Sequence, residues 1–353
     1  MKNNQGKSAV RTTLARYNIF KNAVLSVKYS DLTDSGIDCG DSVDVKSADG
    51  VLVWRDVPFY DGYYAQTHEP MVSHIEKVDM IELLVTFGSI QDEYGIQPGT
   101  EIEISLNSKG KYAIVNAMMN LSYSDRREDF PSDDAFANAR EIRIGKLKER
   151  TLFRSCSPFD NTFNRADFAS AFAERNGVKC ILNLADTKER LESRSENLNP
   201  FLRKLYYKGS IVCCGSNMDY SSPEFARNLC RSLAELPLHE GPFLLHCIEG
   251  KDRIGYVCLI LEALAGSDYN QMEEDYMLSY CNYFNFSKES QPERYDFLVN
   301  YRFKHMLRTI TGIDDLENVS AGEFSSKAEQ FLLENGMTGN EIEALKGAII
   351  SKE

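Results

Sequence analysis

The sequence predicts an α/β protein, in which a parallel sheet flanked by helices (residues 141–353) follows a smaller, mostly-β domain (residues 1–140). The length of 353 residues allows about two domains at roughly 150 residues each. From residue 141 onward, short apolar runs alternate with stretches of helical spacing, which is typical of a parallel sheet with helical connections. Before that point, glycine-containing turns separate short strand-like runs, a pattern that favours a small barrel or sandwich.

In the first segment, alternating polar and apolar residues predict a strand with one buried face at EIEISL (101–106). The runs IELLVTFG (81–88) and YAIVNAMMNLSYS (112–124) are also predicted as strands. Turns are indicated by four pairs, Asp49-Gly50, Asp61-Gly62, Pro98-Gly99 and Lys109-Gly110. The segment contains no catalytic motif, so its role is left open.

The second segment contains four runs predicted as strands of one sheet: TLFRS (151–155), KCILNL (179–184), SIVCC (210–214) and GPFLLH (241–246). The last run is apolar up to its final histidine, as expected for a strand that is covered on both faces. Helical spacing predicts helices over residues 164–177, 221–236 and 256–266, and helices again in the remainder of the chain.

Charge and hydropathy argue against a nucleic-acid-binding protein and against a membrane-spanning one. The chain has 40 Lys and Arg against 53 Asp and Glu, a net charge of −13, which argues against a nucleic-acid-binding protein. No window holds the roughly 18 uninterrupted apolar residues that a membrane span needs. The first twenty residues contain no apolar stretch typical of a secretory signal, so none is expected there.

The nine cysteines include no C-x-x-C pair and no Cys/His pair with the spacing of zinc ligands. We therefore expect no metal and no other cofactor. A disulfide framework is not expected in a chain long enough to build its own core. Reduced thiols favour a cytoplasmic location.

The most informative stretch is FLLHCIEGKDRIG (243–255), in which an apolar strand ends at His246 and a helix begins near Arg253. A tight loop at this place directs unpaired N–H groups and the positive end of the helix toward one point, which suits a tetrahedral anion such as phosphate. Cys247 lies at the floor of this loop, where the same field favours its thiolate form. The guanidinium of Arg253 is suited to hold two phosphate oxygens.

The pattern H-C-x-x-G-K-D-R-x-G resembles the phosphate-binding signature of the cysteine-dependent protein tyrosine phosphatase superfamily. Its Gly-Lys-Asp-Arg form is similar to the bacterial tyrosine and dual-specificity group that also acts on phosphoinositides. LFRSCSP (152–158) and VKCILNLADTKE (178–189) are similar to two further strands of that group. The resemblance covers roughly residues 141–310 and implies a phosphatase-like sheet domain.

The resemblance implies a role for each residue of the loop. Cys247 would be the nucleophile that forms a phospho-cysteine, Arg253 would bind phosphate, and His246 would tune Cys247. Substrate binding is expected from the loop residues Ile248, Glu249, Gly250, Lys251 and Ile254. Lys251 and Asp252 would face the pocket, and Lys251 beside Arg253 would favour substrates with more than one phosphate; the alternative for Lys251 is a solvated lysine.

One position departs from the pattern of the group. A serine or threonine usually follows the arginine and helps the thiolate leave phosphorus, whereas this chain has Ile254. Slower hydrolysis of the intermediate is therefore expected. Ile254 also motivates an alternative function, a catalytically weak or inactive pseudophosphatase that acts as a phosphate-binding module.

Three aspartates compete for the role of general acid, which must protonate the leaving oxygen. Asp252 is placed first, because the matching residue in the resembling group is implicated in catalysis. Asp219 follows, and Asp186, at the end of a predicted strand, comes third. Each of them has an alternative role as a helix cap or turn residue. Arg154 lies either near the pocket, as the resemblance implies, or in a structural ion pair.

The sequence therefore predicts a phosphomonoesterase of the tyrosine or dual-specificity type. The expected substrates are a phosphorylated protein or peptide, or an inositol phospholipid or inositol phosphate. A sulfurtransferase, which also carries a cysteine in a loop before a helix, is disfavoured because its loop is normally shorter and lacks the Gly-Lys-Asp-Arg pattern.

Overall fold

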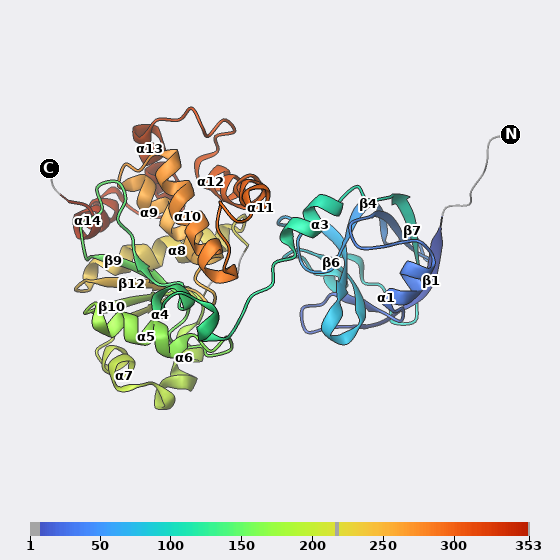
Figure 1. Ribbon diagram of the computed structural model, residues 1–353, viewed down its shortest axis with the longest axis horizontal. Helices are drawn as coiled ribbons and strands as arrows, with labels where there is room; N and C mark the ends of the chain where they lie inside the picture. The colour runs from blue at the N-terminus through green and yellow to red at the C-terminus, as the bar shows by residue number, and fades with distance from the viewer. Residues whose placement is uncertain (1–7, 216–218, 352–353) are drawn as a thin grey trace. The chain divides into compact units, whose positions relative to one another are not determined.

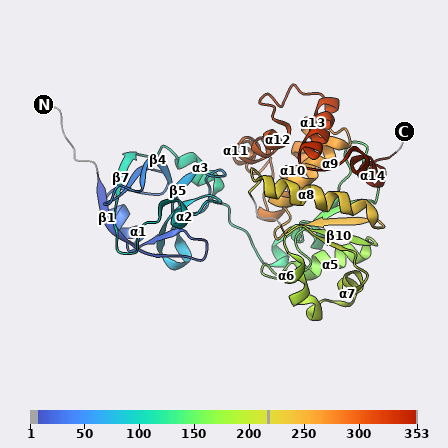
Figure 2. The same cartoon turned by 180° about the vertical axis from the view of Figure 1, so that it is seen from behind.

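The computed structural model describes residues 8–215 and 219–351, which form two compact units, Met1–Leu121 and Ser122–Glu353. Figure 1 and Figure 2 show each unit from opposite sides. The units divide earlier in the chain than the boundary at residue 140 that the sequence pattern indicates.

Buried side chains explain this difference in the boundary. The guanidinium of Arg165, only 2% exposed, donates to the carbonyl oxygens of Ser124 and Phe136, both at 2.9 Å. Arg140 forms an ion pair with Asp275 at 2.8 Å. Residues 122–140 are thus held to the second unit by polar contacts, and Ala137 and Ala139 also belong to its hydrophobic core.

The first unit is a closed barrel with the neighbour order β1-β2-β6-β5-β4-β3-β7. Its strands are β1 (Ala9–Tyr17), β2 (Ala23–Leu25), β3 (Ser42–Ser47), β4 (Val53–Tyr60), β5 (Pro70–Ile75), β6 (Met80–Val85) and β7 (Glu101–Ser108). Short helices connect them, namely α1 (Tyr29–Asp34), η1 (Glu76–Val78) and α2 (Ile90–Tyr94). The strands predicted at 81–88 and 101–106 are confirmed as β6 and β7, and the barrel alternative is confirmed over the sandwich.

The strand predicted over residues 112–124 is wrong, because Ala113–Met119 forms the helix α3. Alanine and methionine favour helices. None of the residues of α3 is fully buried, so no buried sheet face overrides that preference.

The second unit contains a five-stranded sheet with the order β11-β10-β12-β9-β8. Its strands are β8 (Arg140–Glu141), β9 (Leu152–Ser155), β10 (Cys180–Asn183), β11 (Ile211–Cys213) and β12 (Phe243–His246). All neighbours are parallel except β8, which runs antiparallel to β9 at the edge. The four strands predicted in this segment are confirmed, and apolar β12 lies at the centre of the sheet.

Helices cover both faces of this sheet (Figure 1). On one face lie α4 (Asp133–Phe136), α5 (Ala166–Arg175), α6 (Lys188–Arg194) and α7 (Pro200–Tyr207). On the other lie α8 (Pro223–Glu235), α9 (Asp252–Leu264), α10 (Tyr269–Phe284), α13 (Ala321–Glu334) and α14 (Gly339–Ile349). The segment after α10 forms α11 (Pro292–Leu298), the π-helical η5 (Val299–Phe303) and α12 (Lys304–Thr311). Elsewhere in the second unit there are short 3₁₀ turns, namely η2 (Arg127–Asp129), η3 (Ser195–Asn197) and η4 (Leu236–Leu238).

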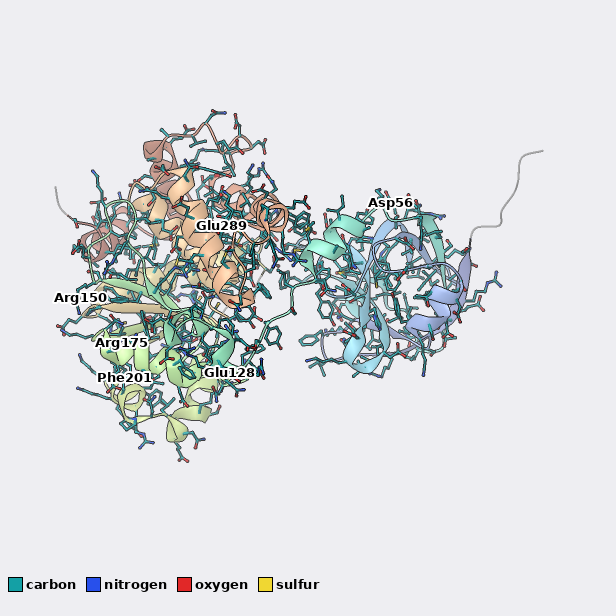
Figure 3. The ribbon with its side chains drawn as sticks, viewed as in Figure 1. Asp56, Glu128, Arg150, Arg175, Phe201 and Glu289 are labelled. Atoms are coloured by element: carbon teal, nitrogen blue, oxygen red, sulfur yellow. The ribbon has the colours of Figure 1, made fainter. Side chains whose placement is uncertain are left out.

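The ends of these helices follow the local sequence. Ser222 caps α8 by accepting hydrogen bonds from its first turn, and Pro223 occupies the first helical position. Arg175 lies at the end of α5, where Figure 3 marks it, and pairs with Asp134 at 2.6 Å. Within residues 8–215 and 219–351, every helix is too short or too polar to cross a bilayer.

Candidate active site

The loop between β12 and α9, residues 247–251, is built around a glycine. Gly250 has a left-handed φ of +76°. A Cβ atom at this position would lie 2.7 Å from the backbone nitrogen of Cys156 and 2.9 Å from the carbonyl carbon of Ser155. The loop therefore lies directly against the end of β9, and only glycine satisfies both the conformation and the close approach.

The carbonyl groups of the loop point outward. The oxygen of Ile248 accepts from the amide of Ser157 at 3.1 Å, and the oxygens of Glu249 and Gly250 accept from Asn138 Nδ2 at 3.2 and 3.1 Å. Because the C=O and N–H of a trans peptide point in opposite directions, the amides that follow these carbonyls face the other side of the loop. Within the described residues, none of the N–H groups of residues 248–252 donates to a backbone carbonyl. The loop thus directs a group of amide donors inward, as an anion site requires.

Cys247 and Arg253 flank this group of amides. Cys247 is 2% exposed at the start of the loop, and Arg253 is half-buried in the first turn of α9. Nη1 of Arg253 donates to the carbonyl oxygen of Leu184 at 3.1 Å, which connects the turn after β10 to the loop. Ile254, the residue after Arg253, is fully buried in the first turn of α9.

Lys251 and Asp252 interact with each other and with α10. The ammonium of Lys251 pairs with Asp252 and lies 2.9 Å from Glu249 Oε2. The hydroxyl of Tyr280 donates to Asp252 Oδ1 at 2.6 Å. Lys251 is therefore neither a solvated lysine nor an uncompensated cation, since two carboxylates neutralise it.

The environment of Asp252 favours its ionised form. Burial raises the pKa of this carboxyl, but the charge and hydrogen bond of Lys251, the Tyr280 hydroxyl and the charge of Arg302 outweigh burial. The pKa of Asp252 is held below its usual value as a result. At neutral pH this side chain is an acceptor of protons rather than a ready donor.

The other two candidate acids differ in their surroundings. Asp186 is fully buried, lies 3.1 Å from Arg190 Nε and 3.7 Å from Arg194 Nη1, and accepts from Asn183 Nδ2 at 3.1 Å. This carboxylate is thus part of an ion-pair network at the start of α6. Asp219 is 8% exposed and accepts from the hydroxyl of Ser221 at 2.7 Å.

Arg154 forms a buried ion pair that joins β9 to α10. Its side chain is fully buried, and Nη1 donates to Asp275 on α10. Asp275 also binds Arg140, while burial, followed by the charge of Asp275, raises the pKa of Glu262 well above its usual value. Of the two roles considered for Arg154, the geometry matches the structural ion pair.

His246 is fully buried beneath the loop, with Nδ1 3.4 Å from the carbonyl oxygen of Cys247 and its ring 5.2 Å from that of Phe159. Burial lowers the pKa of His246 from 6.5 to about 4. The imidazole is therefore neutral at physiological pH.

The low pKa of His246 predicts acid-sensitive stability. The unfolded chain binds a proton near pH 6.5, whereas the folded protein does so only near pH 4, so stability falls as the pH decreases between these values. Between pH 7 and 5 this histidine should remove about 2 kcal/mol of unfolding free energy. Urea unfolding at both pH values measures the loss, and His246→Gln should lose that much less. An equal loss in the variant would assign the acid sensitivity to other groups.

Three residues of the site were not identified from the sequence. Asn138 binds two loop carbonyls and the carbonyl of Ser279, and Tyr280 binds Asp252. Tyr220 stacks on Tyr256 at 4.9 Å, and burial, then the charges of Asp252 and Cys247 among others, raise the pKa of Tyr220. The segment after Asp219 therefore packs against α9, the helix that follows the loop. Of these three residues, only Tyr220 could have been found from the sequence, because it directly follows the candidate acid Asp219.

The described residues, 8–215 and 219–351, include no group of three His, Cys, Asp or Glu side chains placed to hold a metal ion. The loop and the first turn of α9 together contain a buried thiol, inward amides, a guanidinium and a carboxylate. Such a set can bind a phosphate group and attack its phosphorus.

Comparisons with known proteins give one informative result. A family model described as "Tyrosine phosphatase family" matches residues 138–350. No curated protein matches the chain. Among solved structures, the chain is similar to an uncharacterized conserved protein from Thermotoga maritima, with 20% identity and a TM-score of 0.24. That similarity covers 28% of this chain and only 36% of the other, and it carries no argument.

Proposed function

The chain belongs to the tyrosine phosphatase family, and from this premise we propose that it hydrolyses phosphomonoesters through a phospho-cysteine intermediate on Cys247. The observation that supports the proposal most directly is the orientation of the 247–251 loop, whose carbonyls are bound on the outside by Ser157 and Asn138. The inward amides and Arg253 bind the phosphate oxygens and stabilise the charge that develops on them.

The reaction has two steps. In the first, the thiolate of Cys247 attacks phosphorus, an S–P bond forms, the bond to the leaving oxygen breaks, and a general acid protonates that oxygen. In the second, water attacks phosphorus and gives a proton to the conjugate base of the same acid. The S–P bond then breaks, which releases inorganic phosphate and restores the thiolate.

We propose Asp252 as this acid and base, with Asp219 as the second candidate. Asp252 is the first residue of α9, directly after the loop and next to Arg253. Its ionised state suits the second step, in which a carboxylate accepts a proton from water. Asp186 is the third candidate, because Arg190 and Arg194 already bind its carboxylate.

This assignment predicts a distinct pH profile. Because the pKa of Asp252 is held low, its protonated fraction decreases as the pH rises above that value, and kcat/KM should fall from pH 5 to pH 8. Asp252→Asn should remove this fall and slow phenyl phosphate hydrolysis by about 10²-fold. p-Nitrophenyl phosphate, whose leaving group needs no proton, should be affected less. Steady-state kinetics on both substrates measures the difference, and the same pattern in Asp219→Asn instead would assign the acid to Asp219.

The proposed substrates are phosphotyrosine in a protein or peptide, and, as a second class, inositol phospholipids or inositol phosphates. Phosphate release is measured with p-nitrophenyl phosphate, a phosphotyrosine peptide, a phosphoserine peptide and both inositol classes. Release that depends on Cys247 supports the phosphatase, and the ranking of substrates identifies the class.

The second candidate function is a pseudophosphatase that binds phosphate with little turnover. It is favoured by Ile254, a fully buried apolar side chain at the position after the arginine. Phosphate binding without release from any substrate of the panel would support it over the enzyme.

A further inference from the structure

The rim of the phosphate-binding loop carries four charged side chains whose charges cancel. Glu249 and Asp252 are acidic, and Lys251 and Arg253 are basic. A doubly phosphorylated substrate brings about two more negative charges than a singly phosphorylated one. Whether the enzyme prefers the doubly phosphorylated substrate therefore depends on whether Lys251 or Arg253 is available to bind the second phosphate group.

Both the backbone and the side chain of Glu249 have a binding partner. Its carbonyl oxygen accepts from Asn138 Nδ2 at 3.2 Å, and its carboxylate lies 2.9 Å from the ammonium of Lys251. The Glu249 side chain is 31% exposed and that of Lys251 only 12%. The carboxylate thus lies on the solvent side of the pair, where an approaching anion meets it first.

Further contacts hold the Lys251 side chain in this position. It also pairs with Asp252, and its ammonium lies 5.3, 5.9 and 5.7 Å from the ring centres of Tyr280, Tyr283 and Phe284 on α10. To bind a second phosphate, Lys251 would have to leave two carboxylates and these rings.

On these grounds we propose that Glu249 is a specificity determinant, which neutralises Lys251 and so favours substrates with one phosphate over substrates with a second phosphate nearby. The substrate class that fits is a phosphotyrosine peptide without flanking anions. The inference rests on the proposed phosphatase function and refines it.

The test is Glu249→Gln, which removes the charge and keeps the size and the backbone contacts of the residue. kcat/KM is measured for a singly phosphorylated tyrosine peptide and for a soluble inositol bisphosphate. The ratio of the second to the first should rise about tenfold in the variant, because one negative charge near the second phosphate is lost. Glu249→Gln with Lys251→Met should bring the ratio back toward that of the wild type.

The matched control is Glu235→Gln on α8, which removes the same charge from a glutamate that pairs with His239 outside the loop. It should leave the ratio unchanged. A wild-type enzyme that prefers the inositol bisphosphate, or a Glu249→Gln ratio equal to that of the control, would overturn the inference. Absence of Cys247-dependent release from both substrates would instead overturn the phosphatase function itself, so the two failures are distinguishable.

Discussion

Cys247→Ser is expected to lower phosphate release by more than ~10³-fold, because a serine hydroxyl is not ionised near neutral pH and cannot replace the thiolate. Phosphate binding should persist, since the inward amides and Arg253 remain in place. Steady-state turnover measures the loss, and the rise in melting temperature with added phosphate measures binding.

The control for this variant is Cys230→Ser. Cys230 is 1% exposed on α8, and its thiol lies 3.9 Å from the carbonyl oxygen of Leu332, which a serine hydroxyl can also approach. This variant should retain turnover. Activity of Cys247→Ser within tenfold of the wild type would exclude the phospho-cysteine mechanism, whereas loss in both variants would indicate a general intolerance of serine in the core.

Gly250→Ala is expected to disrupt the loop and remove both turnover and phosphate binding. The left-handed conformation alone costs an alanine about 1 kcal/mol, and the new Cβ would also overlap the backbone of Ser155 and Cys156. The total loss of unfolding free energy should reach about 3 kcal/mol, as for other strained or overfilled positions. Urea unfolding and phosphate binding measure the two effects.

Gly266→Ala is a closely matched control. Gly266 has a φ of +75°, almost that of Gly250, but no atom lies within 4 Å of its added Cβ. This variant should lose only the conformational part, about 1 kcal/mol, and keep its activity. Equal losses in the two variants would show that the contact of the loop with β9 is not a constraint.

The features that could be predicted from the sequence are those encoded by neighbouring residues. The apolar run before His246, the glycine of the loop and the start of α9 occur within thirteen consecutive residues, 243–255, so one motif contains the strand, loop and helix. Strand β7 was predictable for the same reason, since its alternation is local.

Contacts between distant residues were not predictable in the same way. Asn138 precedes the loop by more than a hundred positions, and neither its burial nor its three carbonyl partners leave a pattern in one sequence. Whether Lys251 is solvated or paired depends on the direction of its side chain. In the folded protein its ammonium pairs with Glu249 and Asp252 and lies over the rings of α10. The helix α3 was missed because its apolar residues resemble those of a strand.

Asn138 also limits where the second unit can be separated from the rest of the chain. Its single carboxamide joins the loop to α10, and it lies before residue 141, where the hydrophobic pattern changes. A recombination event or an engineered swap at residue 141 would leave behind the carboxamide that binds two carbonyls of the 247–251 loop. A swap at Ser122, where the compact unit begins, would keep this carboxamide together with the loop.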